Sequence, residues 1–206
     1  MSEQDGATAT VAETTVDLAD ADATRAYGEA LAGLLRAGDL VVLTGDLGAG
    51  KTTLTQGIGT GLGVRGAVAS PTFVIARVHP PLPRADGATG PTLVHVDAYR
   101  LGSLDEVDAL DLDTSLDESV TVVEWGEGLV ESLADDRLEV ALRRPRGADA
   151  AGASPHAEHA EDAAAGVRTV TVRARGERWR GVALPGAPAA PAAPSAAPAA
   201  PPAPPA

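Results

Sequence analysis

The apolar residues of this chain fall into short unbroken runs separated by stretches with helical spacing. The runs 40–43 and 120–123 consist mainly of Val and Leu, which is typical of parallel strands that are covered on both faces. Leu93, Val94 and Val96 form a third segment of this kind. Strands of this type, alternating with helices, predict an α/β fold.

Two helices are predicted from apolar residues that recur every three or four positions. The first follows a capping Asp20 or Asp22 and ends at Gly38, and the second ends at Gly63. The residues that share a helical face are Tyr27, Leu31, Leu34 and Leu35 in the first helix and Leu54, Ile58 and Leu62 in the second.

Further strands are predicted at the edges of the sheet. Apolar and polar residues alternate over 138–142 and over 168–174, which indicates an antiparallel pair at the far edge. Val16 and Leu18 predict an edge strand near the start, and 74–76 predicts a short strand after a loop. The expected architecture is a central, mostly parallel sheet flanked by helices, with an antiparallel edge pair.

The composition divides the 206 residues into one folded domain and three segments without a core pattern. Residues 1–12 are small and polar, and 145–166 are rich in Ala, Gly and acidic residues without periodicity. Residues 185–206 are almost entirely Pro and Ala. We therefore expect a domain over 13–184 that carries a flexible insertion at 145–166, with disordered tails at both ends.

Charge and composition exclude several classes of function. The 16 basic and 29 acidic residues give a net charge of −13, so direct binding of bare DNA or RNA is not expected. The chain has no Cys, which excludes disulfides and thiolate metal sites. No apolar run is long enough to span a bilayer and no signal pattern opens the chain, so a cytoplasmic protein is expected.

A full phosphate-binding motif lies between the run 40–43 and the second predicted helix. It matches the pattern G-x-x-x-x-G-K-[ST] and reads Gly45-Asp46-Leu47-Gly48-Ala49-Gly50-Lys51-Thr52, followed by Thr53. The motif requires a strand before it and a helix after it, and both are predicted here. Lys51 is expected to reach the outer phosphates of a nucleotide, and the Thr52 hydroxyl is expected to bind Mg²⁺. The motif predicts a P-loop NTPase.

The role assigned to Lys51 agrees with its rarity. It is the only lysine of the chain, and every other fixed cation is an arginine. A compact ammonium fits between phosphate oxygens, where a planar guanidinium would fit poorly.

Three further residues are candidates for the chemistry. Asp97 and Glu124 each follow an apolar run, and ligands gather at the carboxyl ends of parallel strands. Glu124 is a magnesium ligand, the group that positions the attacking water, or a capping acid. Asp97 is a further magnesium ligand or a helix cap. Thr72 lies in a Ser-Pro-Thr-Phe loop and is either a switch residue that senses the terminal phosphate or magnesium, or part of an ordinary turn.

Two other nucleotide-binding classes share features of this sequence. A small-molecule kinase uses the same phosphate loop, but it needs a lid of mobile arginines and an acceptor pocket, which the acidic segment after Asp97 does not resemble. A GTPase ordinarily recognises guanine through an N-K-x-D segment. The chain contains no Asn, so that mode of base recognition is excluded.

The four ordered motifs GDLGAGKTT, SPTF, HVDAYRL and VEWGE closely resemble those of the TsaE (YjeE) family of bacterial ATPases. The resemblance spans about residues 16–179 without the insertion. It implies binding and slow hydrolysis of ATP with Mg²⁺, with Thr52 and Glu124 as metal ligands, Asp97 nearby and Thr72 as the switch threonine. It also implies an adenine side formed by Ala21 to Thr24 and by Arg168.

The resemblance further implies a role in forming threonylcarbamoyladenosine on tRNAs that read codons beginning with A. The implied partners are the TsaB and TsaD proteins, and tRNA is reached only through that complex. An arginine from a partner, or Arg100 of this chain, is a candidate to complete the catalytic set. The rival interpretation is a docking subunit, in which ATP binding only changes the conformation of the protein so that it docks a partner.

Overall fold

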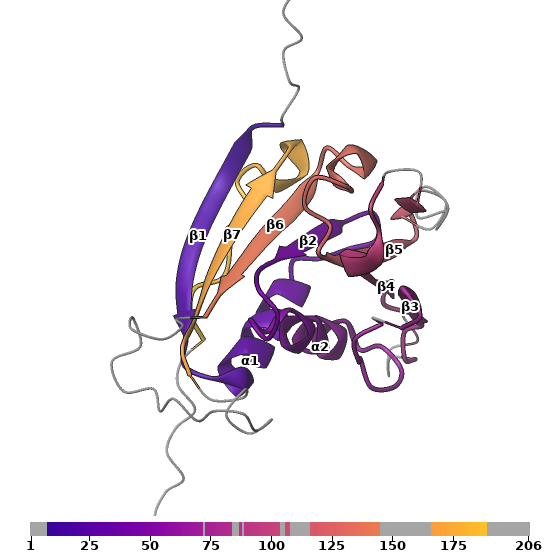
Figure 1. Ribbon diagram of the computed structural model, residues 1–206, viewed down its shortest axis with the longest axis horizontal. Helices are drawn as coiled ribbons and strands as arrows, with labels where there is room; N and C mark the ends of the chain where they lie inside the picture. Colours follow the sequence, from indigo (N-terminus) through magenta and orange to yellow (C-terminus); the bar gives the residue numbers. More distant parts are fainter. Residues whose placement is uncertain are drawn as a thin grey trace, which may run out of the picture.

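A seven-stranded mixed sheet runs through the residues that the structure describes (Figure 1). The computed structural model describes residues 8–71, 73–83, 87, 89–103, 106–107, 116–144 and 166–188. The strand order is β1-β7-β6-β2-β5-β4-β3. The strands are β1 (Thr10–Leu18), β2 (Leu40–Thr44), β3 (Ala76–His79), β4 (Thr92–Asp97), β5 (Ser119–Glu124), β6 (Arg137–Arg143) and β7 (Arg168–Arg175).

The parallel strands form the centre of the sheet, and antiparallel strands lie at both edges. β2 pairs in parallel with β5 and β6, and β4 pairs in parallel with β5. The pairs β1–β7, β6–β7 and β3–β4 are antiparallel. The predicted strands 40–43, 93–96 and 120–123 are therefore confirmed as a parallel core. The expectation of a mostly parallel sheet was too strong, because half of the pairings are antiparallel.

The α-helices α1 and α2 of the described residues cover the same face of the sheet (Figure 1). They are α1 (Ala21–Ala32) and α2 (Lys51–Leu62), and apolar residues of both pack in one cluster with β2, β6 and β7. On the other face, the 3₁₀ helices η1 (Ala98–Arg100) and η2 (Glu131–Leu133) flank a second apolar cluster. In the part of the chain that the structure describes, neither α-helix has the length and apolar character needed to cross a bilayer.

Glycines allow α1 and α2 to approach each other closely. A Cβ on Gly57 of α2 would overlap the backbone carbonyl of Arg25 in α1. A Cβ on Gly28 of α1 would likewise overlap the carbonyl of Leu54. Glycine weakens an isolated helix, so this contact, rather than helix propensity, accounts for its presence here.

Several predicted boundaries were wrong by a few residues. The helix α1 ends at Ala32 with Gly33 as its C-cap, before Gly38. β3 begins at Ala76, because Ile75 adopts a φ of 67° and cannot extend the strand backwards. The antiparallel pair β6–β7 is confirmed, but it is not the edge, because β1 lies beyond β7.

The ends of the folded part also differ from the expected tails. β1 begins at Thr10, inside the range 1–12 that was predicted to be disordered. The Tyr27 hydroxyl donates a hydrogen bond to the carbonyl of Pro185 at 3.1 Å, so the last described segment is held against α1. Val182 and Leu184 pack against the core, as does the buried Trp179 of η4 (Glu177–Trp179). Residues 145–165 and 189–206 lie outside the described residues.

Candidate active site

The phosphate-binding motif forms the loop between β2 and α2, which begins at Lys51. Gly45, Gly48 and Gly50 have φ values of 134°, 78° and 110°, which residues with a side chain rarely adopt. A Cβ on Gly45 would in addition overlap the carbonyl oxygen of Leu142. A tight loop followed directly by a helix N-terminus is an arrangement that binds anions.

The Lys51 ammonium is held between backbone carbonyls and an aromatic ring. Its Nζ donates to the carbonyl oxygens of Gly45 at 2.7 Å and Asp46 at 3.0 Å. It also lies 3.8 Å from the ring centroid of Trp125, in a cation–π contact. Burial lowers the pKa of Lys51, and nearby carboxylates, Glu124 first among them, oppose that shift.

The two strand-end carboxylates lie side by side. β4 and β5 are parallel and in register, with Asp97 opposite Glu124. The Thr52 hydroxyl, at the start of α2, donates to Glu124 Oε1 at 2.9 Å. The structure therefore brings together the hydroxyl and the carboxylate that the sequence assigns to magnesium.

Asp97 also caps the turn that follows it. Its Oδ1 accepts a hydrogen bond from the backbone N–H of Tyr99 at 3.1 Å, and its Oδ2 accepts one from the Ser70 hydroxyl at 3.4 Å. The capping alternative for Asp97 is thus confirmed. A contribution of Asp97 to magnesium binding stays a prediction.

These groups line one cleft of about 440 Å³. Its walls come from the phosphate loop, the start of α2, the ends of β4 and β5 and the start of β7. The lining residues are Leu47, Gly48, Gly50, Lys51, Thr52, Thr53, Ser70, Asp97, Tyr99, Glu124, Trp125 and Arg168.

Of the residues predicted to form the adenine side, only Arg168 lines this cleft. Arg168 is buried and lines it, and burial lowers the pKa of its guanidinium. Ala21 and Thr24 lie in the first turn of α1 and do not line the cleft. The Thr24 hydroxyl instead donates to the carbonyl of Asp20 at 2.7 Å. Thr72 lies outside the described residues, so its role stays a prediction.

Three residues at this site had no role predicted from the sequence. His95 contacts Glu124, with 2.9 Å between His95 Nε2 and Glu124 Oε1. Trp125 contacts Lys51 and also packs against Tyr99, with ring centroids 5.3 Å apart. The signal for His95 was its position two residues before Asp97, because alternate residues of a strand share a face. The aromatic contacts had no comparable signal in the spacing.

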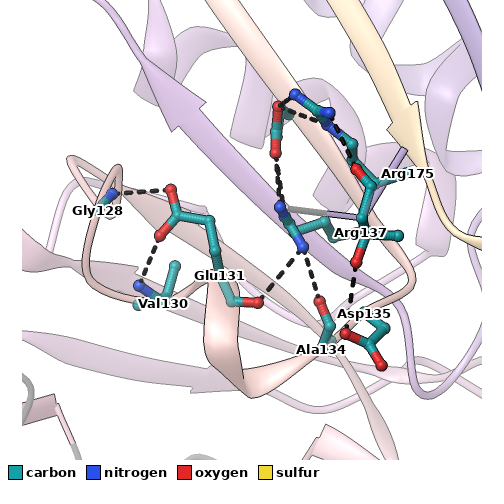
Figure 2. Close-up of polar contacts among 9 residues, drawn as sticks. Gly128, Val130, Glu131, Ala134, Asp135, Arg137 and Arg175 are labelled. Carbon is teal, nitrogen blue, oxygen red and sulfur yellow. Dashed lines mark hydrogen bonds and ion pairs between the residues drawn. The ribbon is translucent and has the colours of Figure 1, made fainter. Parts of the chain in front are cut away.

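A larger hollow of about 870 Å³ lies elsewhere, on the face of β6 and β7 that the helices do not cover. Several of its charged groups bind one another. Arg137 donates to the carbonyls of Glu131 and Ala134 and pairs with Glu139, which also pairs with Arg175 (Figure 2). The Glu131 carboxylate accepts backbone N–H groups of the adjoining turn. This network joins the strands to that turn, and neither Lys51 nor the strand-end carboxylates line the hollow.

Comparison with known proteins places this arrangement in a family. The family model described as "Threonylcarbamoyl adenosine biosynthesis protein TsaE" matches residues 18–150. The chain is 60% identical over 156 residues to the tRNA threonylcarbamoyladenosine biosynthesis protein TsaE of Streptomyces coelicolor, covering 75% of this chain and 93% of that protein. It is 52% identical over 132 residues to the TsaE protein of Mycobacterium leprae, covering 61% of this chain and 80% of that protein.

A solved structure gives a similar result at the level of the fold. The crystal structure of Bacillus subtilis YdiB matches with a TM-score of 0.56 and 28% sequence identity, covering 84% of this chain and 92% of that chain. The likeness supports the mixed sheet with parallel core strands described above. From the extent of the family match and the identity to these relatives, the chain belongs to the TsaE family and is a protein of tRNA threonylcarbamoyladenosine biosynthesis.

Proposed function

We propose that this protein is an ATPase that binds Mg-ATP through the loop 45–50. ATP hydrolysis would support threonylcarbamoyladenosine formation on tRNAs that read codons beginning with A. The observation that carries the proposal is the pairing of Thr52 with Glu124 at 2.9 Å in the cleft that also holds Lys51. A cation for the phosphates and oxygen ligands for a metal are two of the requirements of phosphoryl transfer that a protein has to supply.

The donor set at the cleft fits magnesium. Mg²⁺ prefers oxygen ligands and is usually bound by one or two carboxylates together with substrate phosphates and water. Thr52 offers a hydroxyl whose single proton goes to Glu124, which leaves its lone pairs for a metal. Among the described residues no group of three or more His, Cys, Asp or Glu could hold a metal ion by itself. A site shared with a nucleotide is therefore the arrangement that the donor set supports.

Each residue of the site has a separate task in the proposed reaction. Lys51 would exchange its carbonyl partners for phosphate oxygens, and the loop amides would bind the same phosphates. Thr52 and Glu124, with Asp97 as a further candidate, would hold the magnesium ion, which supplies neutralisation of charge on the phosphates. Orientation of the attacking water would fall to Glu124, Asp97 or Thr72.

The cellular setting of the proposal comes from the family. The relatives are named for tRNA threonylcarbamoyladenosine biosynthesis, and we propose TsaB and TsaD as the partners of this chain. The net charge of −13 opposes direct contact with tRNA, which we therefore place within the complex only.

The first test of the proposal is nucleotide binding. Titration calorimetry with ATP and millimolar Mg²⁺ should give a saturable heat with the wild-type chain and little or none with Lys51→Ala. Phosphate release without a phosphorylated acceptor in a metabolite screen would distinguish an ATPase from a small-molecule kinase. No heat from the wild-type chain would reject the proposal.

The second candidate function is a docking subunit in which ATP binding alone is required. One observation favours it: three apolar or aromatic side chains near the cleft are largely exposed, namely Leu47 at 85%, Phe73 at 87% and Tyr99 at 65%. Exposed apolar groups of this size are common where a partner binds. Glu124→Gln separates the two functions. If tRNA modification in a reconstituted TsaB and TsaD reaction survives while hydrolysis is lost, docking is the function.

A further inference from the structure

We infer that His95 is a positioning residue that fixes the carboxylate of Glu124 for its work at the nucleotide site. This inference rests on the proposed function and adds a residue to it. His95 lies on β4 and Glu124 on the neighbouring parallel strand β5. Their side chains are 0% and 4% exposed, and 2.9 Å separates His95 Nε2 from Glu124 Oε1.

The chemistry of the pair defines which atom donates. A carboxylate oxygen accepts hydrogen bonds, so the proton between the two groups belongs to His95 Nε2. The Thr52 hydroxyl donates to the same oxygen, also at 2.9 Å. Two donors thus bind Oε1 from two different elements. Within the described residues Oε2 receives neither bond, and it is the oxygen left for a metal or a water.

The hydrogen bond to Glu124 distinguishes His95 from a side chain that serves packing alone. Its other ring nitrogen, Nδ1, is buried and has no hydrogen-bond partner in the described part of the chain. Buried polar atoms are nearly always paired, so an apolar side chain would suit this position better if packing were its only role. The cost of the unpaired nitrogen is understandable if the single bond from Nε2 is required.

The fold explains why position 95 can reach Glu124. His95 is two residues before Asp97 and shares its face of β4, and Asp97 lies opposite Glu124 in the register. His95 therefore meets Glu124 diagonally across the pair of strands, within the reach of long side chains. A Glu side chain has three rotatable bonds, and the contacts from His95 and Thr52 would select one of its conformations.

The test compares two substitutions of His95 that place a side-chain amide at different distances from the backbone. The amide nitrogen of Gln can occupy the place of Nε2, whereas that of Asn reaches only to the place of Nδ1. We expect His95→Asn to lower kcat for ATP hydrolysis by about tenfold or more, as is typical when the partner that orients a metal ligand is lost. His95→Gln should recover most of that loss. His79→Asn, at another buried histidine one strand away, is the matched control and should leave kcat near the wild-type value.

A second readout does not depend on turnover. Calorimetry of ADP binding should show that His95→Asn weakens the dependence of affinity on Mg²⁺, while affinity in the absence of Mg²⁺ stays close to that of the wild type. If His95→Asn and His95→Gln both match the wild type in kcat and in Mg²⁺ dependence, the inference is overturned. A wild-type chain that binds no nucleotide instead overturns the proposed function itself, so the two failures are distinct.

A double variant separates positioning from general loss of structure. If His95 acts through Glu124, then adding His95→Asn to Glu124→Gln should weaken the Mg²⁺ dependence of ADP affinity no further. A weakening as large as that in the wild-type background would mean that His95 acts independently of Glu124, and would overturn the inference even if the variant is less stable.

Discussion

Glycine at position 45 illustrates how one residue decides the shape of the site. Its φ of 134° and the approach of the Leu142 carbonyl both exclude a side chain. Gly48 has a φ of 78°, but a Cβ there would have no neighbour within 4 Å. The first glycine is therefore required by conformation and by space, and the second by conformation alone.

This difference predicts the stability of two alanine variants. Gly48→Ala should cost about 1 kcal/mol of unfolding free energy, because only the left-handed backbone is penalised. Gly45→Ala should cost at least about 2 kcal/mol, because the new methyl group also overlaps a backbone carbonyl. Urea denaturation of both variants checks this order. Equal losses would show that the loop moves away from Leu142 at no cost.

The polar residues of the site could be predicted from the sequence, whereas the contacts between them could not. Lys51, Thr52, Asp97 and Glu124 were identified because a motif or a strand end marks each of them, and all four line one cleft. The role of His95 was missed because its position two residues before Asp97 predicts a shared face of β4 but not a contact with Glu124. The structure was needed to show its bond to Glu124.

At the scale of elements, the contact between α1 and α2 was not predictable from local rules. Three glycines, at 57, 59 and 61, lie inside α2 and would each weaken an isolated helix. The apolar spacing of Leu54, Ile58 and Leu62 still identified the helix. The positions of Gly57 and Gly61 make sense only once α1 is seen to pack against them, whereas Gly59 faces Val64, Val68 and Leu93.

The helix contact predicts that Gly57→Ala destabilises the protein although alanine favours helices. The gain in helix propensity is about 1 kcal/mol, and overpacking against the Arg25 carbonyl should exceed it, for a net loss of about 1–2 kcal/mol. The exposed Thr60→Ala in the same helix is the control and should change stability by less than about 0.5 kcal/mol. A Gly57→Ala variant more stable than the wild type in urea would contradict the tight contact.

The attachment of the last described segment to α1 predicts a dependence on alkaline pH. Burial raises the pKa of Tyr27 from 10.0 to about 12. Between these values the unfolded chain releases the phenol proton and the folded chain keeps it, so this group makes the free energy of unfolding fall as pH rises.

Tyr27→Phe removes that dependence. At pH 8 the variant should be less stable by about 1 kcal/mol, because the hydrogen bond to Pro185 is lost. The advantage of the wild type should shrink by about 1 kcal/mol at pH 11, since only its unfolded state gains from ionisation. Denaturant unfolding of both proteins at the two pH values measures the change. A constant difference would mean that the Tyr27 phenol ionises equally in both states.

At the scale of the whole molecule, the parallel core was predictable and the order of the strands was not. Apolar runs identify buried strands, but they do not specify which strands are neighbours. The position of β1 beyond β7, and of Arg168 beside the phosphate loop, depends on pairings between distant parts of the chain. A Cβ on Gly50 would lie 3.4 Å from Arg168 Nε, which shows how closely these parts approach.

In the proposed reaction, the residues of the cleft would supply charge neutralisation and metal ligands, but stabilisation of the transition state by an arginine has no assigned residue. An arginine that stabilises the transition state raises turnover strongly in known phosphate-loop GTPases. The guanidinium of Arg100 lies over the ring of Phe73, with its carbon 5.4 Å from the centroid, and Phe73 is largely exposed. A partner that covers Phe73 could therefore release Arg100 toward the cleft or bring an arginine of its own.

Both routes predict that saturating TsaB and TsaD raise ATP turnover by at least about tenfold. Measurement of phosphate release with Arg100→Ala then separates them. Stimulation that survives the substitution assigns the completing arginine to a partner, because this chain no longer offers Arg100. Stimulation lost while the partners still bind, as measured by calorimetry, assigns it to Arg100. An unchanged rate of the wild-type chain at saturating partner would reject completion of the site by either arginine, and would favour the docking function instead.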